Sequence, residues 1–174
     1  MIGYKQTKYA VQITTPLGPD VLLVDTLDGD EAISSLFEFR LRLLSENSNI
    51  SFESLVGQTV TVSIALPTGQ KKYVNALVGK FRHGGVDGRL AVYYADLYPK
   101  LWLLTHTCDH RIFQNQSVPD IIKALLSAGG ITDVKDSLTG TYASREYCVQ
   151  YGESSFAFVS RLMESEGIFY FFDH

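Results

Sequence analysis

The alternation of apolar and polar residues in the first hundred positions predicts antiparallel β-structure. Two runs show it most clearly, at residues 37–43 and 60–66, where an apolar side chain stands at every second position. This repeat is typical of strands that bury one face. A helix over residues 31–44 is the alternative, but it would place Arg40 on one stripe with Phe37 and Leu41, whereas a strand separates them. The apolar positions are Phe37, Phe39, Leu41 and Leu43 in the first run, and Val60, Val62, Ile64 and Leu66 in the second.

Four further stretches carry a weaker form of the same pattern, at residues 9–15, 21–27, 72–81 and 90–98. Residues typical of turns separate them, at positions 16–19, 28–30, 67–69 and 84–88. Six strands at this spacing predict a closed or nearly closed antiparallel β-barrel. The alternation changes phase near Gly79, which predicts a β-bulge there.

After Trp102 the pattern changes to the period of helices. Ser117, with Asp120 three residues later, predicts the start of a helix that Gly129 and Gly130 end. A second helix should follow Ser154 or Ser155 and end at Gly167, with candidate strands at residues 146–151 and 168–172. We therefore expect a mainly β protein with an α+β part: an antiparallel β-barrel domain over residues 1–104, followed by a small mixed α/β unit over residues 105–174. The buried stripes should be Val118, Ile121, Ile122, Leu125 and Leu126 in the first helix, and Phe156, Val159, Leu162 and Met163 in the second.

The aromatic segment from Ile168 to Phe172 lies close to the last residue of the sequence. An uncovered strand of this composition pairs with other strands and aggregates. Either another strand flanks this segment, or the sequence is the front portion of a longer polypeptide. We favour the second interpretation.

Composition and charge narrow the function classes. The 174 residues carry 15 Lys and Arg against 19 Asp and Glu, and no stretch gathers enough basic residues for a phosphate-binding stripe, so nucleic acid is not an expected partner. The start of the sequence is polar and lacks the apolar core of a secretory signal. No apolar run approaches the ~20 residues of a membrane helix. With only two cysteines, we expect a protein that folds in the cytoplasm, with no stable membrane insertion.

The most suggestive metal-ligand candidates are His106, Cys108 and His110, with Cys148 as a further thiol. In an extended segment the first three would point the same way, and imidazole and thiolate suit zinc. Structural zinc motifs supply two paired knuckles, however, and here the second has one residue. A polar strand edge with one buried thiol is the favoured interpretation, and we expect neither a metal nor a cofactor.

Known catalytic motifs are also missing from the sequence. There is no Gly-x-Ser-x-Gly nucleophile motif, and Gly84, Gly85 and Gly88 lie between two predicted strands, so we interpret them as turn glycines rather than a phosphate-binding loop. Three carboxylates flank the second helix and are best explained as surface residues, so no catalytic residue is expected. Two tyrosine groups belong to sheet faces or to an interface. The carboxylates are Glu153, Glu164 and Glu166, and the tyrosines are Tyr93, Tyr94, Tyr98, Tyr142, Tyr147 and Tyr151.

Several segments together resemble the N-terminal region of VgrG proteins, the spike components of bacterial type VI secretion. The resemblance extends over nearly the whole chain from about Tyr9. The segments that carry it are residues 36–44, 55–57, 84–89, 101–105, 111–121, 145–151, 156–164 and 166–168, which include Leu101-Trp102-Leu103-Leu104, Arg111-Ile112-Phe113-Gln114-Asn115 and Glu166-Gly167-Ile168.

This resemblance implies a fold like that of a phage baseplate hub and a mechanical function. Three copies would form a trimer that docks on the Hcp tube, carries the membrane-puncturing needle and contacts other baseplate and effector proteins. The type VI apparatus would export it after assembly in the cytoplasm, and no catalytic residue carries over. Three alternatives stay open: a hub protein of a contractile phage or prophage, a cell-wall hydrolase that uses Glu153 and Glu164, and a small-ligand barrel with a cavity of roughly 300 Å³ or more in its first unit.

Overall fold

The structure is a computed structural model that describes residues 4–174, and it divides into two compact units. Unit 1 contains the chain up to Glu31, Phe37–Pro99 and Phe172–His174. Unit 2 contains Ala32–Leu36 and Lys100–Phe171. The first residues of the polar N-terminal stretch, 1–3, lie outside the described residues. The expected division into independent domains at residue 104 stays a prediction.

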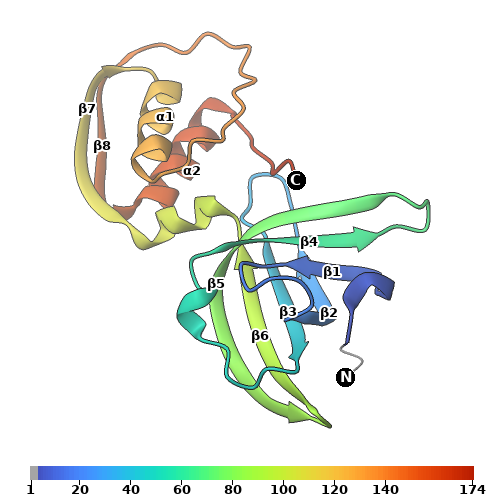
Figure 1. Ribbon diagram of the computed structural model, residues 1–174. Helices are drawn as coiled ribbons and strands as arrows, with labels where there is room; N and C mark the ends of the chain where they lie inside the picture. Colours follow the sequence, from blue (N-terminus) through green and yellow to red (C-terminus); the bar gives the residue numbers. More distant parts are fainter. Residues whose placement is uncertain (1–3) are drawn as a thin grey trace. The chain divides into compact units, whose positions relative to one another are not determined.

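Unit 1 is a six-stranded antiparallel sheet that curls around its own core, as Figure 1 shows. The strand order is β1-β4-β5-β6-β3-β2, so that β1 and β2 form the two edges. The mainly β fold with a curled antiparallel sheet is therefore confirmed. The strands are β1 (Val11–Thr14), β2 (Leu23–Asp30), β3 (Glu38–Ser45), β4 (Thr59–Ala65), β5 (Lys71–Asp87) and β6 (Leu90–Tyr98), with short 3-10 helices η1 (Gln6–Lys8) and η2 (Phe52–Ser54).

The core of unit 1 consists largely of the alternate side chains that the sequence pattern identified, although Leu66 lies beyond the end of β4 and is exposed. In β3 the residues at 39, 41 and 43 are buried, and those at 38, 40 and 42 reach toward solvent. Arg42, on the outer face, forms ion pairs with Asp25 of β2 and Asp87 of β5. These ion pairs connect residues far apart in the sequence across the outside of the sheet. The most deeply buried side chains are Phe37, Leu41, Leu43, Val62, Tyr93 and Leu97.

Strand β5 is longer and more irregular than the pattern predicted. The bulge expected at Gly79 is confirmed, because the register of β5 against β6 shifts between Val78 and Lys80. The prediction that Gly84 and Gly85 form a turn is wrong, since β5 continues through them with a second shift between His83 and Val86. Gly84 lies against Tyr94, where a Cβ atom would come within 2.4 Å of the ring. Of the three glycines, only Gly88 lies in the turn between the strands.

The turn predicted at residues 28–30 is also wrong, because β2 runs through them to Asp30. Gly29 makes this possible. A Cβ atom at this position would lie 2.3 Å from the Glu38 carbonyl oxygen and 2.5 Å from Cδ1 of Phe39, so only glycine lets β2 lie this close to β3. The chain turns later, at residues 33–35.

Unit 2 pairs a two-stranded antiparallel ribbon with two helices (Figure 1). Both helix starts are confirmed: the Asp120 N–H donates to Ser117 Oγ, and the Ala157 N–H donates to Ser154 Oγ. Gly167 ends the second helix in the left-handed conformation, as predicted. The elements are η3 (Lys100–His106), β7 (Cys108–Gln116), α1 (Val118–Ala128), β8 (Arg145–Ser154) and α2 (Ser155–Glu166).

Three details of unit 2 differ from the sequence-based expectations. Strand β7 had not been predicted as the partner of β8. In α2, Phe158 rather than Phe156 is fully buried, because its ring stacks on Phe113 of β7 with centroids 5.7 Å apart. The strand predicted at residues 168–172 is wrong, since no strand pairs with this segment among the described residues.

The segment after α2 is held by individual contacts instead of a strand ladder. Tyr170 accepts a backbone hydrogen bond from Ser34 at 2.8 Å, within unit 2. Within unit 1, the ring of Phe172 packs edge-on against Phe37, and His174 lies between the Asn75 N–H and the Glu31 carboxylate, 3.3 and 3.0 Å away. Phe169 and Phe171 are exposed. The aromatic residues at 168–172 are therefore held by these separate contacts, and not by a continuous strand ladder.

The close approach at Gly29 gives a stability prediction. The variant Gly29→Ala should lower the free energy of unfolding by about 2–4 kcal/mol, because it adds a steric clash to the strain of a positive φ. The matched variant Gly69→Ala also has a positive φ but meets nothing within 4 Å, so it should cost only about 1 kcal/mol. Urea unfolding of both variants measures the difference, and equal losses would contradict the close packing of β2 on β3.

Candidate functional site

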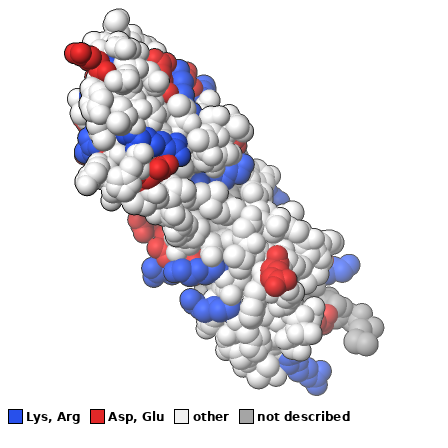
Figure 2. Space-filling view, turned by 90° about the vertical axis from the view of Figure 1, so that its left-hand side faces the viewer, with Lys and Arg blue, Asp and Glu red and all other residues white. Residues whose placement is uncertain are grey.

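The face shown in Figure 2 carries no broad charged patch. On the face shown in Figure 2, Lys and Arg side chains and Asp and Glu side chains lie in small separate groups, with uncharged surface between them. Across residues 4–174, no helix is long and apolar enough to cross a membrane.

The candidate metal ligands are not brought together. His106 lies in η3 with its ring against Trp102, so it does not share a strand with Cys108 and His110. The ring of His110 packs against Tyr151, whereas Cys148 is buried opposite Phe113. In the part of the chain that the structure describes, no group of three His, Cys, Asp or Glu side chains is arranged to hold a metal ion.

Of the three carboxylates considered for catalysis, Glu153 and Glu166 form ion pairs within unit 2, and Glu164 is exposed to solvent. Glu153 of β8 forms an ion pair with Arg161 of α2, with 2.6 Å between Oε1 and the guanidinium. The same guanidinium lies over the ring of Phe158. Glu166 pairs with Arg145 at 2.5 Å. Glu164 is exposed on α2. The ion pairs of Glu153 and Glu166 therefore connect β8 to α2, which is a structural role.

The two groups of tyrosines have different surroundings. Tyr93 and Tyr98 are buried in unit 1, and Tyr94 is half-buried beneath the guanidinium of Arg82. Tyr147 and Tyr151 are exposed by 56% and 78%, on the side of the ribbon that faces away from Cys148 and Gln150. Tyr142 is half-buried, so Tyr147 and Tyr151 are the members of these two groups that are most exposed for an interface.

These two tyrosines belong to a larger uncharged surface, which we call the ribbon face. Cross-strand pairing places Tyr147 opposite Gln114, and Tyr151 opposite His110. Ile112, opposite Val149 in the same register, is 60% exposed. Because α1 and α2 pack on the other side, the ribbon face is left open to solvent. Its residues are His110, Ile112, Gln114, Tyr147, Val149 and Tyr151, and none of them is acidic or carries a permanent positive charge.

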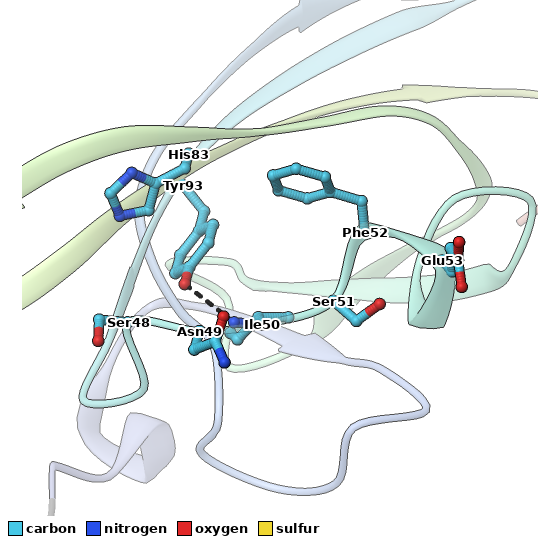
Figure 3. A pocket seen from close by; sticks show the side chains of 8 residues that line it. All are labelled: Ser48, Asn49, Ile50, Ser51, Phe52, Glu53, His83 and Tyr93. Atoms are coloured by element: carbon cyan, nitrogen blue, oxygen red, sulfur yellow. Dashed lines mark hydrogen bonds between the residues drawn. The ribbon is translucent and has the colours of Figure 1, made fainter.

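A hollow of about 420 Å³ opens on the surface of unit 1, beside the loop that leads into η2 (Figure 3). Three rings, those of Phe52, His83 and Tyr93, lie on one side of it, and the segment from Ser48 to Ser51 lies on the other. The hollow exceeds the size that would support a small-ligand barrel, but it is open to solvent and is not enclosed by the sheet. Sequence reasoning missed it, because its residues come from three separate segments.

A small polar cluster surrounds Glu38, the first residue of β3, which pairs with Asp30 at the end of β2. Glu38 accepts a hydrogen bond from Arg40 at 2.9 Å and from the Tyr98 hydroxyl at 3.2 Å. The hydrogen bond from the Arg40 guanidinium is the main reason that the pKa of Glu38 lies below its ordinary value of 4.5. The charge of this carboxylate is thus compensated locally.

Comparison with known protein families gives one match over most of the chain. The sequence profile of the phage tail baseplate hub (GPD) family matches residues 30–174. Among curated proteins, the type VI secretion system spike protein VgrG1a of Pseudomonas aeruginosa is 48% identical over 164 residues, which is 94% of this chain. VgrG1c of the same organism is 44% identical over 98% of the chain. The chain spans only 26% and 24% of the length of these two relatives.

Solved structures give the same picture of the fold. The Escherichia coli c3393 protein, described as a component of the type VI secretion system with structural similarity to the T4 bacteriophage tail proteins gp27 and gp5, superposes with a TM-score of 0.75 at 28% identity. That match covers 87% of this chain and 45% of the other. The 43 kDa tail protein of prophage MuSo2 from Shewanella oneidensis has a TM-score of 0.61 over 91% of this chain and 48% of its own, and at 16% identity it shares the fold.

The ion pair of Glu153 gives a prediction that separates a structural role from a catalytic one. Glu153→Gln should lower the free energy of unfolding by about 0.5–1 kcal/mol, since Arg161 loses its partner, and Glu164→Gln should change it by less than about 0.5 kcal/mol. Thermal or urea unfolding measures both. An increase in stability for Glu153→Gln would contradict the structural role, because removing a strained catalytic group stabilises a protein.

The cluster at Glu38 gives a pH prediction. Because its folded pKa is lowered, Glu38 contributes stability above about pH 4.5, and this contribution is lost as the pH falls through the folded value. In Arg40→Gln the pKa of Glu38, followed by carbon-13 NMR, should rise toward 4.5. The control Arg89→Gln, in an exposed turn, should leave it unchanged. Identical pKa values in the Arg40 variant and the parent chain would contradict the assignment.

Proposed function

The chain belongs to the phage tail baseplate hub family, and on that basis we propose that it forms the hub portion of a VgrG-type spike in type VI secretion. The observation that carries the proposal is the 94% coverage of this chain by a spike protein nearly half identical to it. Its function would be mechanical, without catalysis. The engagement of Glu153 by Arg161 supports this, and it weakens the alternative of a cell-wall hydrolase.

The proposal has further parts that concern the whole protein. Three copies would associate into a trimer that docks on the Hcp tube, carries the needle and contacts baseplate and effector proteins, and the type VI apparatus would export the assembled spike. The names of the spike relatives support the export by type VI secretion, and the described likeness of the c3393 protein to phage tail proteins supports the association into a spike.

The ribbon face is the surface that we propose for association between copies. It is uncharged, it carries two tyrosines and an isoleucine that are more than half exposed, and it lies on a sheet rather than on a loop. Interfaces are enriched in aromatic residues and depleted of charge at their centre. An exposed apolar patch of this kind marks a site where proteins associate.

A hub protein of a contractile phage or prophage is the second candidate. The fold shared with the prophage tail protein favours it. The mechanical function would be nearly the same, and the neighbouring genes would distinguish the two.

Light scattering of two polypeptides tests the proposal. A polypeptide extended to the length of the VgrG relatives should form a stable trimer, and the 174-residue chain should be smaller or prone to aggregate. An interface of the obligate kind buries about 2,000 Å² or more, and we expect the additional length of the relatives to contribute to it. Two well-behaved monomers would contradict the hub function.

Variants of the ribbon face test the proposed contact separately. Tyr147→Ser combined with Tyr151→Ser should abolish the trimer of the extended polypeptide, and should change the unfolding free energy of the short chain by less than about 0.5 kcal/mol, because both side chains are exposed. The control is Tyr9→Ser combined with Tyr73→Ser, at tyrosines that are also exposed, on unit 1. A trimer that survives the first pair would show that the copies associate elsewhere, while the hub function would stand.

A further inference from the structure

The hollow beside η2 is the feature of unit 1 that the hub function does not explain. It lies entirely within unit 1, and its lining comes from the loop at residues 48–53, from β5 and from β6. Its volume of about 420 Å³ is within the range of small-molecule sites, which is ~300–1,000 Å³. The hollow is therefore large enough for a small molecule, and its lining residues determine which class of ligand it can bind.

The base of the hollow is rigid. The ring of Tyr93 stacks on Phe81 with centroids 5.1 Å apart and planes 6° apart. Its hydroxyl donates to the Asn47 carbonyl at 3.0 Å and accepts the Ile50 N–H at 3.2 Å, the second bond being drawn in Figure 3. These bonds fix the loop to the sheet, so that binding would not require the loop to become ordered.

An aromatic surface remains available above this base. Phe52 packs edge-on against Phe81, with centroids 5.9 Å apart, and is still 48% exposed. Its ring extends over the hollow toward Tyr93 (Figure 3). A half-exposed ring held at a fixed angle offers a flat apolar surface on which the C–H face of a sugar ring can lie.

The polar groups around the hollow both donate and accept hydrogen bonds. Ser48, Asn49 and Ser51 carry exposed hydroxyl and amide groups. Nδ1 of His83 accepts the Gly85 N–H at 3.3 Å, so that Nε2 is the nitrogen that carries a proton. A ligand rich in hydroxyl groups needs partners of both kinds, and the lining supplies them.

The lining of the hollow carries no permanent positive charge, which favours neutral ligands over anionic ones. None of the residues that line the hollow is a lysine or an arginine, and the single carboxylate, that of Glu53, lies beyond Ser51 and away from the three rings (Figure 3). A phosphate or carboxylate would find no cationic partner there. We propose that the hollow binds a neutral carbohydrate, with one sugar ring on Phe52 and its hydroxyl groups on Asn49, Ser51 and His83.

Titration of the chain with two neutral oligosaccharides tests this proposal. Chitotetraose and maltotetraose are added to the nitrogen-15-labelled chain up to about 20 mM, a range that detects millimolar dissociation constants. At least one of them should shift the amide signals of residues 48–53 and 83–85 in a saturable way. No shift with either sugar, or shifts elsewhere on the chain, would overturn the proposal.

Two variants make the result specific to the hollow. Phe52→Ala should weaken binding about tenfold, and Tyr73→Ala, which removes an equally exposed ring elsewhere on unit 1, should leave it unchanged. Equal affinity in Phe52→Ala would overturn the proposal. So would shifts of the same amides on simple dilution without sugar, because they would show that a second protein molecule occupies the hollow.

Discussion

The curled sheet of unit 1 depends on one constraint: each of its four central strands, β4, β5, β6 and β3, must direct alternate side chains into a single core while its backbone pairs on both sides. Leu41 and Leu43 of β3, Val62 of β4 and Leu97 of β6 satisfy it, since each is almost fully buried. The outward residues then carry the charges, as the ion pairs of Arg42 with Asp25 and Asp87 show. Where the alternation has to change phase, β5 bulges at Gly79 and again near Gly85.

The sequence predicted the strands of unit 1 well because their burial is one-sided, and it predicted both helices because serine caps and terminal glycines mark their ends. It failed where a glycine acts through packing. Gly29 and Gly84 suggested turns, but each lets a strand lie against an aromatic side chain, and this depends on a neighbour that is distant in sequence. It also missed β7 and wrongly predicted a strand at residues 168–172, because a strand requires a partner and the residues of a single segment do not identify one.

The candidate sites were likewise predictable only where their residues are close together along the chain. His106, Cys108 and His110 could be found in the sequence because they are close together along the chain, yet η3 and β7 place them in different surroundings. Tyr147 and Tyr151 could be identified as interface residues, whereas Ile112 could not, because its place on the ribbon face depends on the β7–β8 register. The hollow at Phe52, His83 and Tyr93 joins three segments and left no local pattern.

In unit 2 the two helices cover one side of the ribbon and leave the other side open. A surface of this kind suits a protein whose function is to associate, and it agrees with membership of the baseplate hub family. Cryo-electron microscopy of a polypeptide extended to the length of the VgrG relatives is the most direct test. Our account predicts particles with threefold symmetry in which the ribbon faces lie at the contacts between copies. Particles that contain a single copy, or copies related by a twofold axis alone, would contradict it.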